Sequence, residues 1–387
     1  MVSWAAIGVL MSRQISIFNF LLLSLLMCAI AAGQSVPPIP PVLSVTPMGT
    51  VTQNPVIYGR DGAISALIDG KSVWTFGDTP MSVPGIEGNN WDDNTLSWTN
   101  SLDASNGINL NHDLLDSTGA PAEFLPYLSW ERDYNYAHDN HHCTEDPCGA
   151  EFAMWPGQPI PDPARHRALF PYYELWRVSG QAGWKSVGTG FAVGTLRGKI
   201  TRPIQNPDSK TSTLMWGKDE VGFNSGSITV NDTLYAYGCV AGFLVQNCQL
   251  GRVPLSGVLN KQLWTFYAGN NTWSTNAADA VTVFQGGDAG NTIYHNSYLE
   301  VYMVIYSGVF SDNLYYRVAY QPWGPWSDQA LLFTGLKGWN NNANYAGHAH
   351  TEFAEANGQI QYITYSHTTG PFRSDIPLVK IVFGRAQ

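Results

Sequence analysis

Apolar and polar residues alternate in several short runs of the chain, and the clearest runs flank a two-residue turn. The pattern predicts one strand from Ala63 to Ile68 and a second from Ser72 to Phe76, with Asp69-Gly70 as a tight hairpin turn between them. Asp61 precedes the first strand and Asp78 follows the second. Because residues equally distant from a hairpin turn lie opposite each other, we expect these two carboxylates to lie close together at a sheet edge.

Similar patterns recur further along the chain. Alternating or hairpin-like segments are predicted at 168–178, 186–193, 218–238, 296–307 and 350–366. Turns near residues 70, 172, 232, 300 and 358 give five units at a period of roughly 60 to 70 residues, the second step being lengthened by a loop-rich insertion at about 81–165. Self-similar four-stranded units predict an all-β fold, a five-bladed β-propeller, with a stacked β-sandwich as the alternative.

A propeller would bring residues from several blades together. The innermost strand of each blade lines a central channel, so residues just before those strands converge at one mouth. These candidates are Asp61, Asp219, Glu220, His295, His350 and Glu352. Paired acids held by rigid strands are what glycoside hydrolysis needs, although acids beside a hairpin more often cap turns.

The N-terminal segment has the features of a secretory signal. An apolar run from Phe18 to Ala32 ends in small residues and is short for a membrane span, so we predict a signal peptide over 1–33, with an uncleaved anchor as the alternative. A Pro-rich lead-in over 34–48 would then precede a single domain over 49–387. The predicted protein is secreted, with no membrane contact after signal removal.

The composition narrows the class of partner. The net charge is −10 and only 13% of residues are charged, which argues against nucleic acid, whose binding depends on phosphate neutralisation. The 14 Trp and 19 Tyr residues suit a neutral polysaccharide, because the apolar face of a sugar packs on an aromatic ring. Such a protein could hydrolyse the polymer or bind it without catalysis.

Four cysteines remain after the predicted signal. We favour the local disulfides Cys143–Cys148 and Cys239–Cys248, because each closes a short loop. Zinc bound by Cys143 and the nearby histidines (His138, His141 and His142) is the alternative, although the paired spacing of structural zinc sites is lacking.

The run from Gly59 to Thr79 resembles the N-terminal signature of a bacterial and fungal domain family long regarded as uncharacterised, which includes endo-D-arabinanases. The segment from Ala346 to Phe353 resembles that family's later His-Pro-Glu stretch, with Thr351 in place of the usual proline. The resemblance spans roughly residues 50 to 385 and implies a five-bladed propeller with glycosidase activity. Ala63 stands where the family pattern suggests glycine.

The resemblance matches Asp61 and Asp78 to the family's acidic positions, and His350 and Glu352 to its later motif. We assign Asp61 as nucleophile or base, and Asp78 or Glu220 as the acid, whose pKa burial must raise. Candidates for substrate binding are Arg60, Trp74, Trp216, His295, His350 and Glu352. No cofactor is required; analogy with other propellers leaves a structural calcium ion open.

Overall fold

The computed structural model describes residues 35–86, 88–181, 183–196, 198–242 and 245–386. From Pro37 onward the chain forms one compact unit, and the predicted signal over 1–33 lies outside the described residues. Within the described ranges, no helix is long and apolar enough to cross a membrane.

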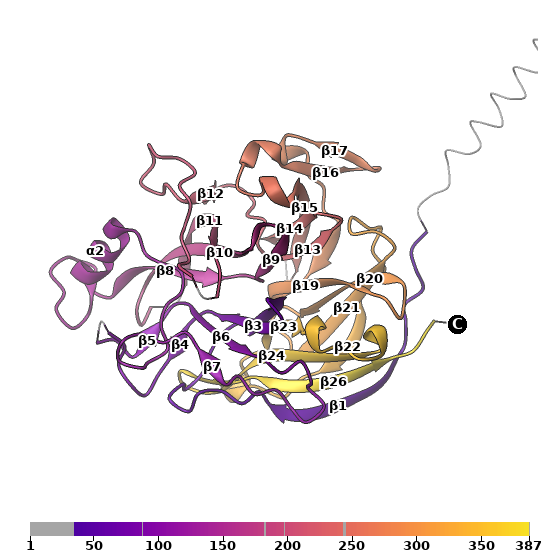
Figure 1. The fold of residues 1–387 in the computed structure, drawn as a ribbon, viewed down its shortest axis with the longest axis horizontal. Coiled ribbons are helices and arrows are strands. Elements are labelled where there is room, and N and C mark those ends of the chain that lie inside the picture. The colour runs from indigo at the N-terminus through magenta and orange to yellow at the C-terminus, as the bar shows by residue number, and fades with distance from the viewer. Residues whose placement is uncertain (1–34, 87, 182, 197, 243–244, 387) are drawn as a thin grey trace, which may run out of the picture. The chain divides into compact units, whose positions relative to one another are not determined.

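The unit is built from five antiparallel sheets (Figure 1). The first contains β2 (Ile64–Ile68), β3 (Lys71–Phe76), β6 (Thr95–Thr99) and β7 (His112–Asp113). The second contains β8 (Ala150–Pro156), β9 (Ile160–Asp162), β10 (Arg167–Val178), β11 (Trp184–Gly194) and β12 (Leu214–Gly217). The third contains β13 (Gly226–Val230), β14 (Thr233–Ala241), β15 (Gln246–Pro254), β16 (Thr265–Gly269), β17 (Thr272–Ser274) and β18 (Phe284–Gly286).

The remaining sheets complete the unit. The fourth contains β19 (Asp288–Asn296), β20 (Val301–Ser307), β21 (Asn313–Ala319) and β22 (Ala330–Thr334). The fifth contains β23 (Tyr345–Ala349), β24 (Ile360–Gly370), β25 (Arg373–Asp375), β26 (Pro377–Phe383) and β1 (Val42–Thr50). A two-stranded ladder joins β4 (Thr79–Pro80) to β5 (Trp91–Asp92), and α2 (Ser129–His138) is the one α-helix of the described chain. The all-β class is therefore confirmed.

One strand from each sheet contacts the next in cyclic order. β2 contacts β9, β9 contacts β13, β13 contacts β19, β19 contacts β23, and β23 contacts β2 again. Apolar clusters fill the spaces between successive sheets: Val73 packs with Phe170 between the first and second sheets, and Phe191 with Trp264 between the second and third. The cores thus lie between sheet faces, and the polar ends of the five strands are left to form a site.

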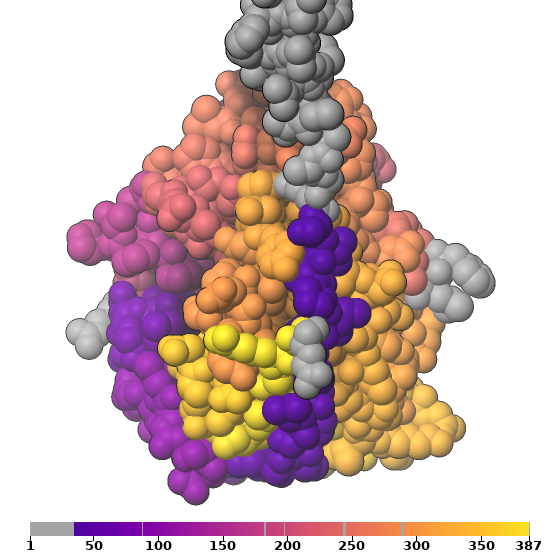
Figure 2. Space-filling model, turned by 90° about the vertical axis from the view of Figure 1, so that its right-hand side faces the viewer, coloured from indigo at the N-terminus to yellow at the C-terminus, as the bar shows by residue number. Residues whose placement is uncertain are grey.

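The two ends of the described chain meet in the fifth sheet. β1 pairs antiparallel with β26, with Val45 opposite Ile381, and Figure 2 shows the indigo N-terminal segment beside the yellow C-terminal strands. β1 begins inside the segment predicted as a Pro-rich lead-in, so part of that segment belongs to a sheet. This pairing covers the edge of β26 that faces away from β24 and leaves fewer unpaired backbone groups.

Most predicted turns are found, and one is wrong. Asp69 and Asn231 have φ of 49° at the predicted hairpin turns, where Asn, Asp and Gly tolerate the left-handed conformation. The turn predicted near residue 172 is absent, because β10 runs without interruption through Tyr172 and the chain turns after Val178. The 81–165 region provides β5 to β9 and α2, and so contributes strands to two sheets.

Candidate functional site

The open end of the β2–β3 hairpin brings Asp61 and Asp78 together, as the sequence predicts. The backbone nitrogen of Asp61 donates to the carbonyl of Asp78 at 3.2 Å, and that of Gly77 donates to the carbonyl of Asp61 at 2.8 Å. The chain enters β2 through Gly62 and Ala63, whose φ angles are 96° and 58°. This left-handed pair explains why glycine would suit position 63, and it bends the backbone so that both carboxylates share one edge.

Arg177 of β10 joins this edge to the second sheet. One terminal nitrogen donates to Asp78 Oδ2 at 2.6 Å, Nε donates to Glu151 Oε1 at 2.6 Å, and the other terminal nitrogen bonds Asp93. Arg177 lies directly opposite Glu151 in the β8–β10 register, which fixes one of these pairs. One guanidinium therefore holds three carboxylates from separate chain segments, and its planar fork suits that role.

Burial raises the pKa of carboxyl groups at this site, including Asp61 and Asp93. The pKa of Asp61 is raised to about 7, by burial first and by the nearby charge of Asp78 second, whereas the Tyr345 hydrogen bond and Arg177 oppose the shift. Tyr345, at the start of β23, donates its hydroxyl to Asp61 Oδ1. Asp61 can consequently give or take a proton near neutral pH.

The Asp78 carboxylate is held by two donors. Trp155 Nε1 donates to Oδ1 at 3.1 Å, and Arg177 donates to Oδ2. Each carboxylate oxygen has two acceptor directions, so these bonds orient Asp78 and leave capacity for water or a substrate hydroxyl. The pair thus combines an acid that titrates near neutrality with a fixed neighbouring carboxylate.

His350 and Glu352 lie instead in a second cluster in the protein interior. Ser65 Oγ contacts His350 Nδ1 at 2.6 Å and donates to Glu352 Oε1 at 2.6 Å, and Ser72 Oγ also donates to Glu352. His350 stacks on the buried ring of Trp74 at 4.0 Å between ring centres. The substrate-binding role predicted for Trp74, His350 and Glu352 has no support here. Trp74 and His350 are buried, and the half-buried Glu352 accepts hydrogen bonds from two serine hydroxyl groups.

Burial also determines the protonation of the interior cluster. It lowers the pKa of His348 to about 4, lowers that of His350, and raises that of Glu352. Both histidines are accordingly neutral at physiological pH. Each forms a hydrogen bond with a threonine hydroxyl group, His348 with Thr292 and His350 with Thr364. This is how buried polar groups stabilise a core.

Arg60 and Trp216 are buried and serve packing. Arg60 is 1% exposed, pairs with Asp113 at 2.9 Å and lies over the Phe76 ring. Trp216 is also 1% exposed and belongs to the apolar cluster between the second and third sheets. Neither side chain can reach a polymer at the surface in this conformation, so the predicted substrate contacts do not follow from the structure.

Glu220 and His295 are exposed. Glu220 bonds Lys261 at 2.5 Å and the backbone nitrogen of Gly217 at 2.9 Å, which are the contacts of a surface ion pair and a turn. Asp219 pairs with Lys218, and His295 packs edge-on against Tyr302. Among the described contacts, none joins Glu220 to the Asp61–Asp78 edge, so its assignment as the acid gains nothing from the structure.

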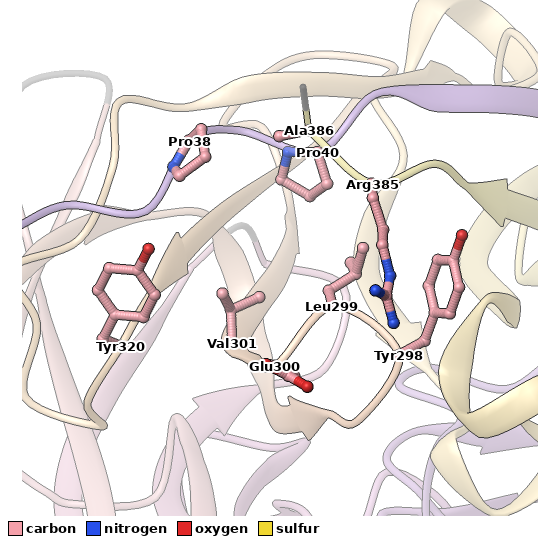
Figure 3. Close-up of a pocket in the computed structure, with 9 residues that line it drawn as sticks. All are labelled: Pro38, Pro40, Tyr298, Leu299, Glu300, Val301, Tyr320, Arg385 and Ala386. Atoms are coloured by element: carbon pink, nitrogen blue, oxygen red, sulfur yellow. The ribbon is translucent and has the colours of Figure 1, made fainter.

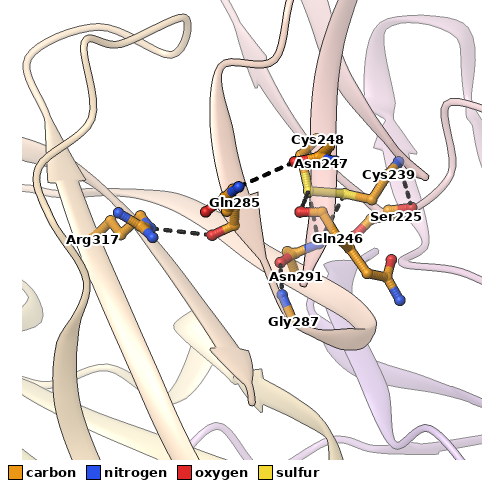
Figure 4. Close-up of a disulfide and its surroundings, with 9 residues drawn as sticks. All are labelled: Ser225, Cys239, Gln246, Asn247, Cys248, Gln285, Gly287, Asn291 and Arg317. Carbon is orange, nitrogen blue, oxygen red and sulfur yellow. Dashed lines mark hydrogen bonds between the residues drawn. A yellow bond between two sulfur atoms is a disulfide. The ribbon is translucent and has the colours of Figure 1, made fainter. Parts of the chain in front are cut away.

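Both favoured disulfides are present. Cys143 bonds Cys148, and Cys239 of β14 bonds Cys248, its direct partner in β15. Figure 4 shows the second bond beside Asn291, whose side-chain nitrogen donates to Ser225 and Cys239.

The described chain offers little for a metal ion. Its one close group of three potential ligands is Cys143, Asp146 and Cys148, and the disulfide occupies both sulfur atoms. None of the three neighbouring histidines belongs to that group.

A surface pocket of about 240 Å³ lies away from the paired acids, between the N-terminal segment, the β19–β20 turn and the C-terminal residues (Figure 3). Pro38 and Pro40 lie on one side, and the Arg385 guanidinium lies 5.0 Å from the ring centre of Tyr298 on the other. Glu300 is the one carboxylate in its lining. Chemistry that needs two carboxyl groups therefore points to the Asp61–Asp78 edge.

Sequence reasoning missed Arg177, Tyr345, Asp93 and Glu151. These residues come from other strands or loops, and no local pattern links them to the hairpin. The one local signal is an arginine directly after a tryptophan in an aromatic-rich strand, at Trp176-Arg177.

Comparison with solved structures finds similar chains at low sequence identity. A Bacteroides ovatus protein described as a hydrolase candidate is 13% identical, with a TM-score of 0.55 over 85% of this chain and 86% of that one. A family 117 glycoside hydrolase from Zobellia galactanivorans is 12% identical, with a TM-score of 0.48 over 88% and 90%. The catalytic domain of a Coprinopsis cinerea GH62 α-L-arabinofuranosidase is 12% identical, with a TM-score of 0.43 over 90% and 100%.

The comparison by sequence is more specific. No curated protein matches the chain. A family model matches residues 51–369, a range that includes the Asp61–Asp78 edge, Arg177 and Tyr345. The chain therefore belongs to the DUF4185 family, whose description is a domain of unknown function.

Proposed function

We propose that the protein is a secreted glycoside hydrolase that cleaves arabinofuranose-containing polysaccharide, in the manner of an endo-D-arabinanase. The observation that carries the proposal is the pairing of Asp61 with Asp78 at one sheet edge, where the pKa of Asp61 is raised to about 7. Two carboxyl groups of which one keeps its proton near neutrality are the requirement of glycoside hydrolysis. The arabinan substrate comes from the family resemblance of the Gly59–Thr79 run.

The same proposal treats the five sheets as five blades of a β-propeller. Three observations support this: the sheets follow one another along the chain, one strand of each contacts the next in cyclic order, and β1 completes the last sheet. A stacked sandwich would instead place two sheet faces against each other, without a cyclic series of inner strands. The paired acids would then lie at one mouth of the central channel.

In this mechanism Asp61 acts as the general acid. Its raised pKa lets it give a proton to the leaving glycosidic oxygen, which reverses the role that we expected from the sequence. Asp78, oriented by Trp155 and Arg177, is the partner carboxylate that activates water or attacks the sugar carbon. Tyr345 positions the Asp61 carboxyl through its hydroxyl.

Secretion is supported by the two disulfides, which persist in oxidising compartments. The substrate would be a neutral polysaccharide, consistent with the net charge of −10. A non-catalytic carbohydrate-binding module is the second candidate, and the exposed aromatic residues near Asp78 favour it as much as they favour an enzyme.

The test is an assay of wild-type protein, Asp61→Asn and Asp219→Asn on mycobacterial D-arabinan and plant L-arabinan. Asp219 is an exposed acid, so it serves as the matched control. Release of short arabino-oligosaccharides by wild type and Asp219→Asn, with none from Asp61→Asn, would support the proposal. Equal release by all three would remove Asp61 from the mechanism. Binding without release by any of them would support the carbohydrate-binding module.

A further inference from the structure

We infer that two groups of aromatic side chains near Asp78, each with at least one exposed ring, bind sugar units of one polysaccharide chain and set the preference for a polymer. The inference rests on the proposed function, because it assigns the substrate contacts of the same site. The two tryptophans that the sequence suggested as substrate contacts, Trp74 and Trp216, are buried, so the exposed rings have to come from other positions.

The first aromatic group comes from the second sheet and consists of Trp155, Tyr173 and Trp184. The ring centres of Trp155 and Trp184 are 5.8 Å apart, and those of Tyr173 and Trp184 are 5.2 Å apart, both edge to face. Tyr173 lies opposite Trp155 in the β8–β10 register, and Trp184 lies opposite Arg177 in the β10–β11 register. The three rings and the guanidinium therefore belong to one neighbourhood, and Trp184 is 51% exposed.

The second aromatic group consists of Tyr58 from the segment before β2, Trp91 of the β4–β5 ladder and Phe372 between β24 and β25. The ring centres of Trp91 and Phe372 are 5.6 Å apart, edge to face, and Arg373 lies over the Tyr58 ring at 4.4 Å. Phe372 is 73% exposed and has a φ of 54°, at the turn between β24 and β25. The β25 strand reaches the catalytic edge, because Ser374 Oγ accepts a hydrogen bond from the backbone nitrogen of Arg60.

Asp78 connects the two groups through different oxygen atoms. Oδ1 accepts from Trp155, in the first group, whereas Oδ2 accepts from Arg177. The guanidinium carbon of Arg177 lies 5.9 Å from the ring centre of Trp91, in the second group. Asp78 therefore contacts Trp155 of the first group directly and is linked to Trp91 of the second group through Arg177. A bound chain would cross the Asp61–Asp78 edge with sugar units on both sides.

The chemistry of the region selects a neutral carbohydrate. Acidic side chains surround Arg177, so a polyanionic ligand would meet like charge at Asp78, Asp93 and Glu151. The C–H faces of sugar rings pack on aromatic rings, and the neighbouring carboxylates accept hydrogen bonds from their hydroxyl groups. Large exposed rings beside a polar edge are a mark of a binding surface.

The test compares Trp184→Ala and Phe372→Ala with Phe310→Ala. Phe310 is a matched control, since it is 81% exposed, has a φ of 51° and lies in the β20–β21 connection of the fourth sheet. We expect each site variant to raise KM for arabinan about tenfold with kcat nearly unchanged, because losing one stacking contact worth about 1.4 kcal/mol costs a factor of ten. KM for a trisaccharide should change less, and Phe310→Ala should match wild type.

A binding measurement separates this inference from the proposed catalysis. The same three substitutions are placed in the Asp61→Asn background, and affinity for soluble arabinan is measured by electrophoresis through gels with and without the polymer. Weaker retardation of the Trp184 and Phe372 variants than of the Phe310 variant would support the inference, even if the wild type hydrolyses nothing. Equal retardation of all variants, or equal KM values in the active background, would overturn it.

Discussion

The β2–β3 hairpin carries two polar clusters that differ in their access to solvent. At its open end, Asp61 and Asp78 meet Arg177 and Tyr345, and the Asp78 and Arg177 side chains are 14% and 15% exposed. Further toward the turn, Ser65 and Ser72 bind His350 and Glu352 in the core, and His350 is fully buried.

The difference between the clusters shows what makes a candidate catalytic group. In the interior cluster, burial keeps His348 and His350 neutral, and their ring nitrogens bond hydroxyl or backbone groups. At the open end, burial and a like charge raise the pKa of Asp61 while the pair remains at a surface edge. Perturbed protonation indicates a functional site only where a substrate can reach the group.

The largest expected effect is the loss of activity in Asp61→Asn. Removing the proton donor should lower kcat on arabinan by about 10²–10⁴-fold, because that is the usual contribution of general acid catalysis. Glu352→Gln in the interior cluster should keep kcat within about twofold for the folded protein, since Glu352 contacts no substrate. Equal losses in the two variants, measured as initial rates of reducing-sugar release, would erase the distinction between the clusters.

Arg177→Met should destabilise the protein by about 3–5 kcal/mol, because it leaves three partly buried carboxylates without their cation. Arg177 also opposes the rise in the pKa of Asp61, so its loss should move the alkaline limit of activity to higher pH. The measurements are urea unfolding and a pH–rate profile. Arg165→Met is the control: Asp162 keeps Arg167 as a partner, and a change above about 1 kcal/mol there would weaken the argument.

The stability of the wild type should depend on pH through Asp61. The pKa is about 7 in the folded state and about 3.9 in an unfolded chain, so the folded state binds this proton more tightly. The contribution favours folding below about pH 4 and is lost as the pH rises through about 7. The unfolding midpoint of Asp61→Asn should therefore rise relative to that of the wild type as the pH increases from about 4 to about 8. If the midpoints of the two proteins change with pH in parallel, the assigned pKa shift is contradicted.

Glu352→Gln should lower stability by about 1–3 kcal/mol. Glu352 Oε1 accepts hydrogen bonds from the Ser65 and Ser72 hydroxyl groups, and the substitution replaces this carboxyl group with an amide. Glu220→Gln, at a surface ion pair with Lys261, should change stability by less than about 1 kcal/mol and leave kcat unchanged. Thermal unfolding of both variants checks this order, and a larger loss for Glu220→Gln would reverse it.

Local sequence patterns predicted the hairpin and its paired acids well. Asp69-Gly70 determines the position of the hairpin turn. The position of the turn determines which residues of the two strands lie opposite each other, and so makes Asp61 and Asp78 neighbours. The turn predicted near Tyr172 is wrong because β10 is buried along most of its length, and a strand buried on both faces lacks period-two alternation.

Patterns could not predict which candidates reach the site. Glu220 lies in a segment whose sequence pattern is similar to that of the first hairpin. Whether Glu220 is exposed, however, depends on how neighbouring sheets pack, which the sequence of that segment alone does not determine. Arg177 lies 99 residues from Asp78 in the sequence, so only the packing of the second sheet against the first reveals their contact. Site assignment therefore needs the tertiary arrangement, whereas hairpin assignment does not.

The most direct test of the central claim is the titration of Asp61 itself. Carbon-13 NMR of protein labelled at aspartate carboxyl carbons, with Asp61→Asn to assign the resonance, follows its protonation directly. We predict a midpoint of about 7, in agreement with burial and the neighbouring Asp78 charge. A midpoint below about pH 5, within the ordinary range of aspartate, would contradict the account of Asp61 as the proton-donating acid.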